Sequence, residues 1–302
     1  MSSSTQTSTA IPFAVATLGM ASFSTMDVIM KGLSISLGAY NAMLWRMLAG
    51  IFIGGALFIA KGERWPVQSI FRLHVLRGSV TAVSAFSFFW GLVRVPLAEA
   101  VALSFIAPLI TLYLAAILLA ERIGRAAVGA TLIGLAGVLV ILSARVTGDY
   151  QPDALRGIAA ILFSAILYSY NLVLQRRQAQ LASPIEIAFF QNLTAGGVLM
   201  LGAPWLGVLP DASHAPAIAG AAVTATIALL LLSWAYARAE AQVLVPVEYT
   251  AFIWAALFGW YVYDEALTAA TLAGTGLIVA GCVIAARLKP QARAEHVEIA
   301  AL

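Results

Sequence analysis

The chain has 302 residues, of which 62% are hydrophobic and only 10% are charged, and its formal net charge is +3. A soluble domain carries roughly 25% charged residues, so a surface with so few charges is expected to face lipid. The small net charge favours neither a nucleic acid nor an acidic protein as a partner. The single cysteine, Cys282, excludes a disulfide within the chain.

Residues 1–10 form a polar stretch without a positively charged start, so we expect a short N-terminal tail and no cleavable signal peptide. The apolar segments that follow are each near the roughly 20 residues needed to cross the hydrocarbon core of a bilayer. They lack the alternation of a lipid-facing barrel strand. The sequence therefore predicts an all-α integral membrane protein with ten transmembrane helices, at about 11–30, 40–60, 74–93, 96–120, 126–143, 155–175, 184–204, 216–236, 242–263 and 267–287. Residues 288–302 are expected to form a C-terminal tail.

The distribution of lysine and arginine predicts the orientation of the chain in the membrane. With the N-terminus inside, the inner loops and tail contain eleven of these residues and the outer loops contain four. Basic residues accumulate on the cytoplasmic side of membrane proteins. Both termini are therefore predicted to be cytoplasmic.

A short motif repeats at an offset of 144 residues. WGLVR at 90–94 returns as WAYAR at 234–238. The same offset pairs Glu121 with Glu265, Gly137 with Gly281 and Asp27 with Asn171, and a two-residue slip aligns 46–50 with 192–196. Since five is an odd number of spans, a second set of five enters the membrane upside down relative to the first. We expect two inverted five-helix repeats, residues 11–149 and 150–287, around a central cavity.

The repeat resembles a known transporter family. Each half ends with a glutamate-headed loop and a glycine-rich last helix, Glu121 to Gly137 and Glu265 to Gly281. This pattern resembles the EamA-type members of the drug/metabolite transporter superfamily over essentially the whole chain. It is most similar to the YddG-type aromatic amino-acid exporters of bacterial inner membranes. The resemblance implies a multi-pass inner-membrane protein, a basket of helices around a cavity with the last helix of each half outside it, and efflux of amino acids.

Polar side chains within the bilayer are costly and face a cavity or one another, so each is a candidate for function. Asp27 lies near the outer end of the first span, four residues before Lys31. The two could form a helix-end pair with Lys31 extending to the interface, or Asp27 could belong to an outer gate or carry a proton. Arg46 is expected to pair with Asp27 or Glu99, either structurally or as a gate that closes the outside.

The predicted ninth span contains a second candidate carboxylate. Glu248 and Tyr249 follow Pro246, which is expected to kink the helix beside the acid. Glu248 could line the cavity, or Arg77 could neutralise it. Pro108 is expected to kink the fourth span, with a role in shape and none in chemistry.

The predicted sixth span presents Ser164, Tyr168 and Asn171 on one helical face. These groups suit hydrogen bonding to a substrate's amino group and carboxylate, or to a neighbouring helix. Four aromatic residues could line the cavity or pack at the lipid interface: Phe86, Trp90, Trp234 and Trp254.

Together these features predict a transporter. Carriers of phosphate esters need cations to bind phosphate, whereas only Arg46 lies deep in the bilayer, so a neutral or zwitterionic solute fits better. We expect export of aromatic and other neutral amino acids, such as Phe, Tyr, Trp, Met, Leu and Thr, by alternating access. The alternatives are a multidrug or cationic-metabolite efflux carrier, a channel and a lipid translocator. An enzyme is not expected, because no metal-ligand set or clustered nucleophile is found, and no cofactor is expected. Proton coupling, through Asp27 or Glu248, and the oligomeric state stay open; a monomer is compatible with the pattern.

Overall fold

The computed structural model describes residues 10–107, 109, 110, 114, 125–146, 152–179, 181–236, 247 and 250–287. Every regular element among these residues is helical. The elements are α1 (Ala10–Leu37), α2 (Ala39–Ala60), α3 (Gln68–Leu92), α4 (Leu97–Ser104), α6 (Arg125–Val146), α7 (Pro152–Ala179), α8 (Pro184–Leu206), the 3-10 turn η1 (Ala212–His214), α9 (Ala215–Tyr236), α11 (Thr250–Tyr263) and α12 (Ala269–Arg287).

Six of these helical segments are long and apolar enough to cross a membrane: Ile11–Leu37, Ala39–Ala60, Gln68–Leu92, Asp153–Gln175, Pro184–Leu206 and Ala212–Ala235. Shorter apolar helices lie at Leu132–Ile141, Thr250–Tyr263 and Ala269–Gly281. The chain is therefore an all-helical, multi-pass membrane protein. The predicted fourth and ninth spans lie partly outside the described residues, so the number ten stays a prediction.

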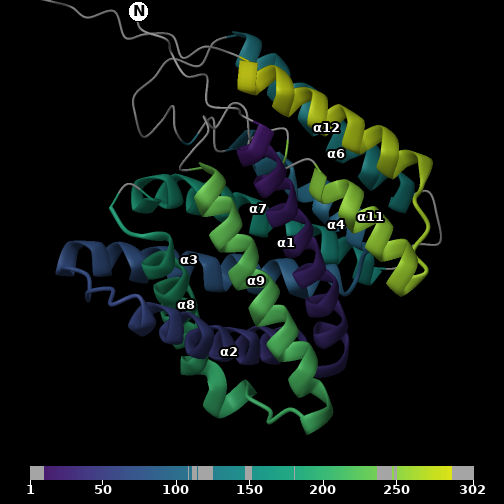
Figure 1. Ribbon diagram of the computed structural model, residues 1–302. Helices are drawn as coiled ribbons and strands as arrows, with labels where there is room; N and C mark the ends of the chain where they lie inside the picture. Colours follow the sequence, from purple (N-terminus) through teal and green to yellow (C-terminus); the bar gives the residue numbers. More distant parts are fainter. Residues whose placement is uncertain are drawn as a thin grey trace, which may run out of the picture.

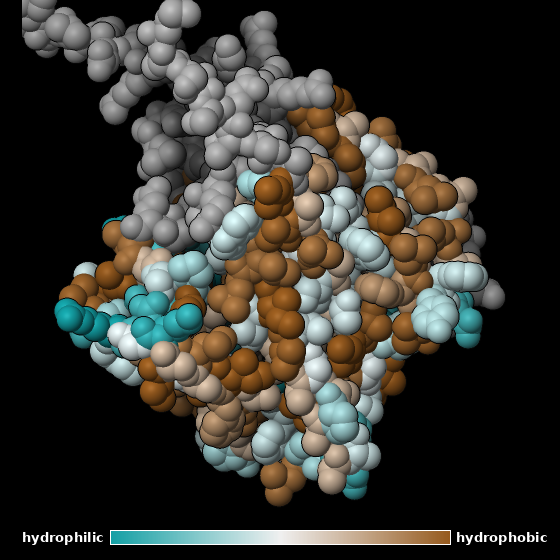
Figure 2. All heavy atoms as spheres, viewed as in Figure 1, coloured by the Kyte–Doolittle hydropathy of each residue, from teal (hydrophilic) through white to brown (hydrophobic). Residues whose placement is uncertain are grey.

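The surface agrees with a membrane setting. Figure 2 shows hydrophobic side chains over most of the visible face, across α1, α9 and α11. Hydrophilic side chains gather at two margins of this face, beside the α2–α3 connection on the left and the α11–α12 connection on the right. Large apolar side chains such as Phe52, Ile59 and Trp260 are exposed. In lipid this exposure carries no hydrophobic cost, because the acyl chains are as apolar as the side chains.

The helices pack in pairs that join the two parts of the chain. The closest neighbours are α1 with α9, α3 with α7, α2 with α8, and α6 with α12. If α1, α2, α3 and α6 are exchanged in order for α7, α8, α9 and α12, this set of pairs is unchanged. The weaker contacts of α2 with α9 and of α3 with α8 also exchange with each other. The packing is thus two-fold symmetric at the level of helix pairs.

The helix α6 pairs with α12 at the edge of the bundle, where Figure 1 shows the two lying side by side. A Cβ atom on Gly137 would lie 2.5 Å from the carbonyl oxygen of Gly274, and one on Gly274 would lie 2.6 Å from the oxygen of Gly137. Neither position tolerates a larger residue without moving a helix. Small residues of this kind let membrane helices approach closely and gain van der Waals contact.

Candidate functional site

Three groups of polar side chains lie inside the bundle, at one end, at the other end and between them. The first group, the Lys31 cluster, consists of Lys31 and Glu265 with the backbone of Val95 and Leu97. Lys31 is only 4% exposed. Its ammonium donates to the Glu265 carboxylate and to the Val95 carbonyl, the latter at 2.9 Å. The other Glu265 oxygen accepts from the Leu97 N–H at 2.7 Å, at the start of α4. The cluster therefore ties α1, α4 and the α11–α12 connection together.

The Lys31 cluster excludes one of the two predicted roles of Asp27, the helix-end pair with Lys31. Lys31 neither extends to the interface nor pairs with Asp27, because it bonds to Glu265, 234 residues away in sequence. Glu99 also acts on Lys31 electrostatically, and it makes no ion pair with Arg46. The packing of α1 against α11 and of α11 against α4 brings these groups together, and no local pattern encodes it.

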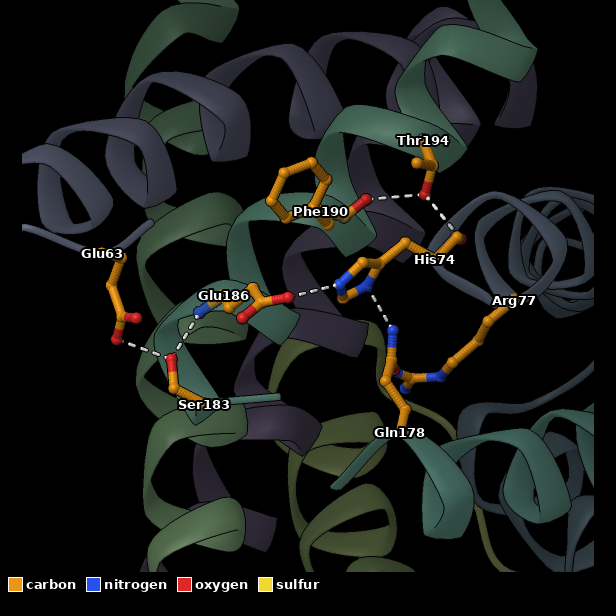
Figure 3. A network of polar contacts seen from close by, with 8 residues as sticks. All are labelled: Glu63, His74, Arg77, Gln178, Ser183, Glu186, Phe190 and Thr194. Carbon is orange, nitrogen blue, oxygen red and sulfur yellow. Dashed lines mark hydrogen bonds and ion pairs between the residues drawn. The ribbon is translucent and has the colours of Figure 1, made fainter. Parts of the chain in front are cut away.

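The second group, the His74 chain, runs through Glu186, His74, Gln178 and Arg77, which Figure 3 shows, and continues to Asn171. His74 Nε2 lies 2.9 Å from Glu186 Oε1, and its Nδ1 meets the Gln178 amide nitrogen. The Gln178 oxygen accepts from Arg77 Nη1, and Arg77 Nε donates to Asn171 Oδ1 at 3.0 Å. His74 and Arg77 are 1% and 4% exposed. The chain links α8, α3 and α7.

The His74 chain has a defined direction. A guanidinium only donates hydrogen bonds, so the Gln178 oxygen must face Arg77 and the Gln178 amino group must face His74. His74 Nδ1 is therefore an acceptor, and the ring proton lies on Nε2, facing Glu186. If Nδ1 were also protonated, its N–H would point at the N–H group of Gln178, and two donors cannot bond to each other. If the Gln178 amide flipped to accept from Nδ1, its amino group would then point at the Arg77 guanidinium, which is also only a donor. The protonation of His74 and the bond between α3 and α7 are thus linked.

Further contacts hold this end of the bundle. Ser183 caps α8 by accepting from the Glu186 N–H at 3.1 Å, and its hydroxyl donates to Glu63 at 2.6 Å (Figure 3). Thr194 donates to the backbone oxygens of His74 and Phe190 at 3.1 and 2.6 Å. The His74 ring stacks on Phe190 with 4.7 Å between centroids. A capping hydroxyl of this kind stabilises a helix start by about 1 kcal/mol.

The predicted sixth-span stripe faces α3. Ser164 exchanges hydrogen bonds with Ser84, donating to the Ser84 carbonyl at 2.7 Å while the Ser84 hydroxyl donates to the Ser164 carbonyl at 3.0 Å. Asn171 accepts from Arg77. Ser164 and Asn171 therefore form interhelical bonds, one of the two predicted roles. Tyr168 is 43% exposed and acts on Arg77 electrostatically.

These contacts follow one register along two antiparallel helices. Along α7, the residues Gly157, Ser164, Asn171 and Gln178 recur every seven positions. Their partners on α3 run in the opposite direction: Gly91, Ser84, Arg77 and His74. A Cβ on Gly91 would lie 2.6 Å from the Gly157 oxygen, so the helices nearly touch at that end. A seven-residue repeat is the spacing of a helix–helix seam.

The third group, the Asp27–Arg46 pair, lies between α1 and α2. The two charges attract each other electrostatically. They form no direct ion pair within the described part of the chain. Arg46 is 8% exposed, its Nε has no hydrogen-bond partner, and its Nη2 lies 3.3 Å from Met47 Sδ. The predicted neighbour of Arg46 is therefore present, and the predicted direct bond is not.

The predicted aromatic residues do not gather in one place. Trp90 lies at the end of α3, with the Arg94 guanidinium 3.4 Å from its ring centroid, and Arg94 Nε donates to Asp153 at 3.2 Å. Trp254 stacks on Phe258 with 6.1 Å between centroids. Phe86 packs on the main core, and Trp234 packs on the small cluster around Ala16 and Ala235.

Four predicted residues lie outside the described residues: Pro108, Pro246, Glu248 and Tyr249. The predicted neutralisation of Glu248 by Arg77 stays a prediction, and the partners that Arg77 has are the two amides of α7. A shallow, mostly apolar groove of about 400 Å³ opens between α1, η1, α9 and α11, lined by Gly32, Ser36, His214 and Tyr263 among others.

The Lys31 cluster and the His74 chain lie at opposite ends of the bundle. His74 is near the start of α3, and Val95 follows the end of that helix. At 1.5 Å per residue, the intervening length of α3 is about 30 Å, the thickness of a hydrocarbon core. Lys31, His74, Gln178, Glu186 and Glu265 were not predicted as site residues. The seven-residue spacing in α7, and His74 three residues before Arg77, were the only local signals.

A bundle of apolar helices with buried polar groups at both ends and in the middle is the architecture of a membrane transporter. The sequence profile of the EamA-like transporter family matches residues 11–143 and again 155–287. The chain therefore belongs to the EamA-like transporter family, and it is a transporter and not an enzyme.

Individual relatives agree with this assignment. An "uncharacterized transporter" of Helicobacter pylori J99 is 28% identical over 222 residues, covering 72% of this chain and 74% of the relative. The pseudopaline exporter CntI of Pseudomonas aeruginosa PAO1 is 24% identical over 277 residues, covering 91% and 95%. The S-adenosylmethionine uptake transporter of Rickettsia prowazekii is 22% identical over 262 residues, covering 87% of each chain. A solved crystal structure superimposes with a TM-score of 0.63 at 23% identity, covering 91% of this chain and 96% of the other, which shows the shared fold.

Proposed function

We propose that this protein is a secondary carrier that exports neutral amino acids, the large aromatic ones included, across a bacterial inner membrane by alternating access. The observation that carries the carrier mechanism is the pair of polar clusters at opposite ends. The Lys31 cluster joins α1 and α4 to Glu265, and the His74 chain joins α3 to α7 and α8. Each cluster connects the earlier half of the chain to the later half. A carrier needs such a contact at each end, because it closes one end while opening the other.

The arrangement in the membrane follows from the same elements. Ten spans in two inverted halves, 11–149 and 150–287, would place the Lys31 cluster on the outside and the His74 chain on the inside, with both termini in the cytoplasm. The symmetric exchange of helix pairs and the two ranges matched by the family profile support this arrangement. The peripheral position of α6 and α12 supports a cavity formed by the other helices.

The substrate class rests on charge. The expectation that only Arg46 lies deep in the bundle is wrong, because Lys31 and Arg77 are also buried among the described residues. Lys31 is already bonded to Glu265, and Arg77 to two amides of α7. Arg46, in contrast, has only a neighbouring carboxylate, Asp27, to balance it. A polyanionic solute would meet too little positive charge, whereas a zwitterion would meet one charge of each sign. The relatives named above include an exporter and an uptake transporter, so family membership does not fix the direction of transport. Export and the YddG-type subgroup are proposed on the sequence resemblance.

The test is uptake of labelled phenylalanine into proteoliposomes that contain the full chain. Uptake should saturate and should accelerate when unlabelled phenylalanine is present inside, because a carrier exchanges substrate faster than it returns empty. An imposed proton gradient should then be added, and a further rise in uptake would establish proton coupling. Uptake that rises linearly with concentration and ignores internal substrate would indicate a channel. Transport of cationic dyes in place of phenylalanine would indicate a multidrug carrier.

The gating role of the two clusters has its own test. In a Cys282→Ser background, cysteines at Lys31 and Glu265, or at His74 and Glu186, are linked by a short bifunctional thiol reagent. Either link should stop exchange, and cleavage of the link should restore it. The matched control is a single cysteine at Lys31 treated in the same way. Exchange that continues with both ends linked would contradict alternating access.

A further inference from the structure

Two opposite charges lie inside the bundle without the hydrogen bonds that buried charges need. Arg46 is more than nine-tenths buried, and its Nε has no partner. Its one hydrogen bond runs to the thioether of Met47, a weak acceptor. Asp27 forms no hydrogen bond or ion pair within the part of the chain that the structure describes. Each specific unsatisfied polar group in a native interior requires an explanation.

A structural ion pair does not explain these groups, because the same protein shows what its structural ion pairs look like. Lys31 contacts Glu265 directly, and a carbonyl and a backbone N–H complete the cluster. Asp27 and Arg46 attract each other without contact. Asp27 is also partly accessible, although it lies ten residues inside the end of α1. Both residues therefore keep hydrogen-bonding capacity that the described part of the protein does not use.

The second half of the chain shows that the fold does not demand charges at these positions. The repeat aligns Asp27 with Asn171 and Arg46 with Asn192. Asn171 accepts hydrogen bonds from Arg77 and Thr81, and Asn192 donates to the Ala188 carbonyl at 2.9 Å. Neutral amides therefore fill the equivalent places and are satisfied by the protein itself. Charges that the protein leaves unsatisfied in a membrane interior are retained for a ligand.

We infer that Asp27 and Arg46 form the binding site for the α-ammonium and α-carboxylate groups of an amino-acid substrate. This inference rests on the proposed amino-acid transport. The guanidinium donates paired N–H groups to the carboxylate, a geometry that arginine supplies and lysine does not. The Asp27 carboxylate accepts from the ammonium group. A zwitterion adds no net charge to a pair that is itself balanced.

The surroundings of the pair suit side chains of different shapes. Four methionines from α1 and α2 are buried in the same core: Met26, Met30, Met43 and Met47. Unbranched thioether side chains adapt to irregular apolar neighbours. The carboxylate of a substrate would also replace the weak Met47 acceptor at Arg46 with a charged one. The site therefore requires both backbone charges of an amino acid and is tolerant of its side chain.

The test measures binding of three ligands to the purified full chain: phenylalanine, phenethylamine, which lacks the carboxylate, and 3-phenylpropionate, which lacks the amine. The unaltered protein should bind phenylalanine at least about tenfold more tightly than either analogue, since one charge-assisted hydrogen bond is worth that factor or more. Arg46→Lys should weaken phenylalanine and phenylpropionate while leaving phenethylamine unchanged. Asp27→Asn should weaken phenylalanine and phenethylamine while leaving phenylpropionate unchanged. The matched control is Arg72→Lys, an exposed position on α3, which should change nothing.

If a single variant fails to fold, the double variant Asp27→Asn with Arg46→Gln tests the same binding site. It removes both charges, so no ion is left unpaired inside the bundle. It should retain its elution profile and bind all three ligands with similar, weak affinity. If the double variant still prefers phenylalanine tenfold, the inference is wrong and amino-acid transport stands. If the unaltered protein binds no amino acid, the proposed function fails and the inference fails with it.

Discussion

The two halves of this transporter use the same helical positions in opposite ways. At the equivalent places on their first helices, α1 carries Asp27 and α7 carries Asn171. Asn171 is buried and bonded to Arg77 across the α3–α7 seam. The position equivalent to Arg77 on α9 is Ala221, which has no side chain that could bond to Asp27. Polar groups of α3 and α7 therefore bond to each other across their contact. At the equivalent contact of α9 with α1, Asp27 has no hydrogen-bond partner on α9 within the described residues.

The same contrast runs along both seams. Ser84 and Ser164 bond across α3 and α7, whereas the offset of 144 residues places Ala228 and Met20 at the equivalent sites of α9 and α1. Lys31, which bonds to Glu265, corresponds to the uncharged Gln175. A duplicated fold can thus assign structural bonding to one copy and ligand binding to the other, because the packing of each helix pair depends on shape more than on charge.

The largest effect is expected when one charge of the unsatisfied pair is removed. Arg46→Gln leaves the partly accessible Asp27 carboxylate without a counter-charge inside the bundle, so the protein should lose stability, by at most the roughly 3–5 kcal/mol of a broken buried ion pair. Thermal unfolding in detergent, followed by size-exclusion chromatography, measures the loss. Adding Asp27→Asn to the same chain should restore most of it. A single variant as stable as the unaltered protein would show that the two charges are solvated and independent.

Lys31→Gln makes the Lys31 cluster resemble its counterpart in the other half. Glu265 then keeps its bond to the Leu97 N–H and loses its cation. We expect a loss of about 1.5–3 kcal/mol, the range for a hydrogen bond to a charged group, together with easier opening at this end. In a Cys282→Ser background, labelling of a cysteine introduced at Ser34, which is 4% exposed near the same end of α1, should become faster. Unchanged labelling and stability would assign Lys31 no role in closure.

Asn171→Asp places a carboxylate on α7 at the position equivalent to Asp27 of α1. The new carboxylate lies next to Arg77, whereas the equivalent neighbour of Asp27 is Ala221. The new charge should form a direct ion pair with Arg77, because their hydrogen bond is already 3.0 Å long. Charge-assisted bonds are roughly twice as strong as neutral ones, so a gain of about 1 kcal/mol is expected, with slower exchange because this end opens less readily. Asn171→Leu is the control of similar size. Faster exchange in the aspartate variant would contradict a closing role for the His74 chain.

The smallest effect is expected at the hydroxyl pair. Ser84→Ala and Ser164→Ala should each cost about 1 kcal/mol, and the double variant should cost less than their sum because the partners satisfy each other. A double-mutant cycle on thermal stability gives the coupling. Additive losses would show that the hydroxyls bond mainly to their own helices.

Much of the helical framework was predictable, because each span is specified locally by apolar length. The predicted 40–60 and 184–204 correspond to Ala39–Ala60 and Pro184–Leu206. The predicted roles of polar residues fared less well. Of the two carboxylates expected near Arg46, Asp27 is the one that acts on it, and of the two readings of Asp27, the pair with Lys31 is wrong because Lys31 bonds to Glu265. His74, which no local pattern marks as a site residue, bonds to Glu186 and Gln178 within a chain of five residues.

The sequence by itself determined that this chain is a multi-pass helical membrane protein with an internal repeat. Hydropathy and repeated spacing are properties of the chain alone, and the bilayer forces each apolar segment to satisfy its own backbone as a helix. Which buried charges meet depends on tertiary packing. Lys31 and Glu265 are 234 residues apart, and their contact depends on how α1, α4 and α11 pack. Tertiary packing also brings Asp27 within electrostatic reach of Arg46 without a direct ion pair, and it places Ala221 on α9 at the position where α3 has Arg77.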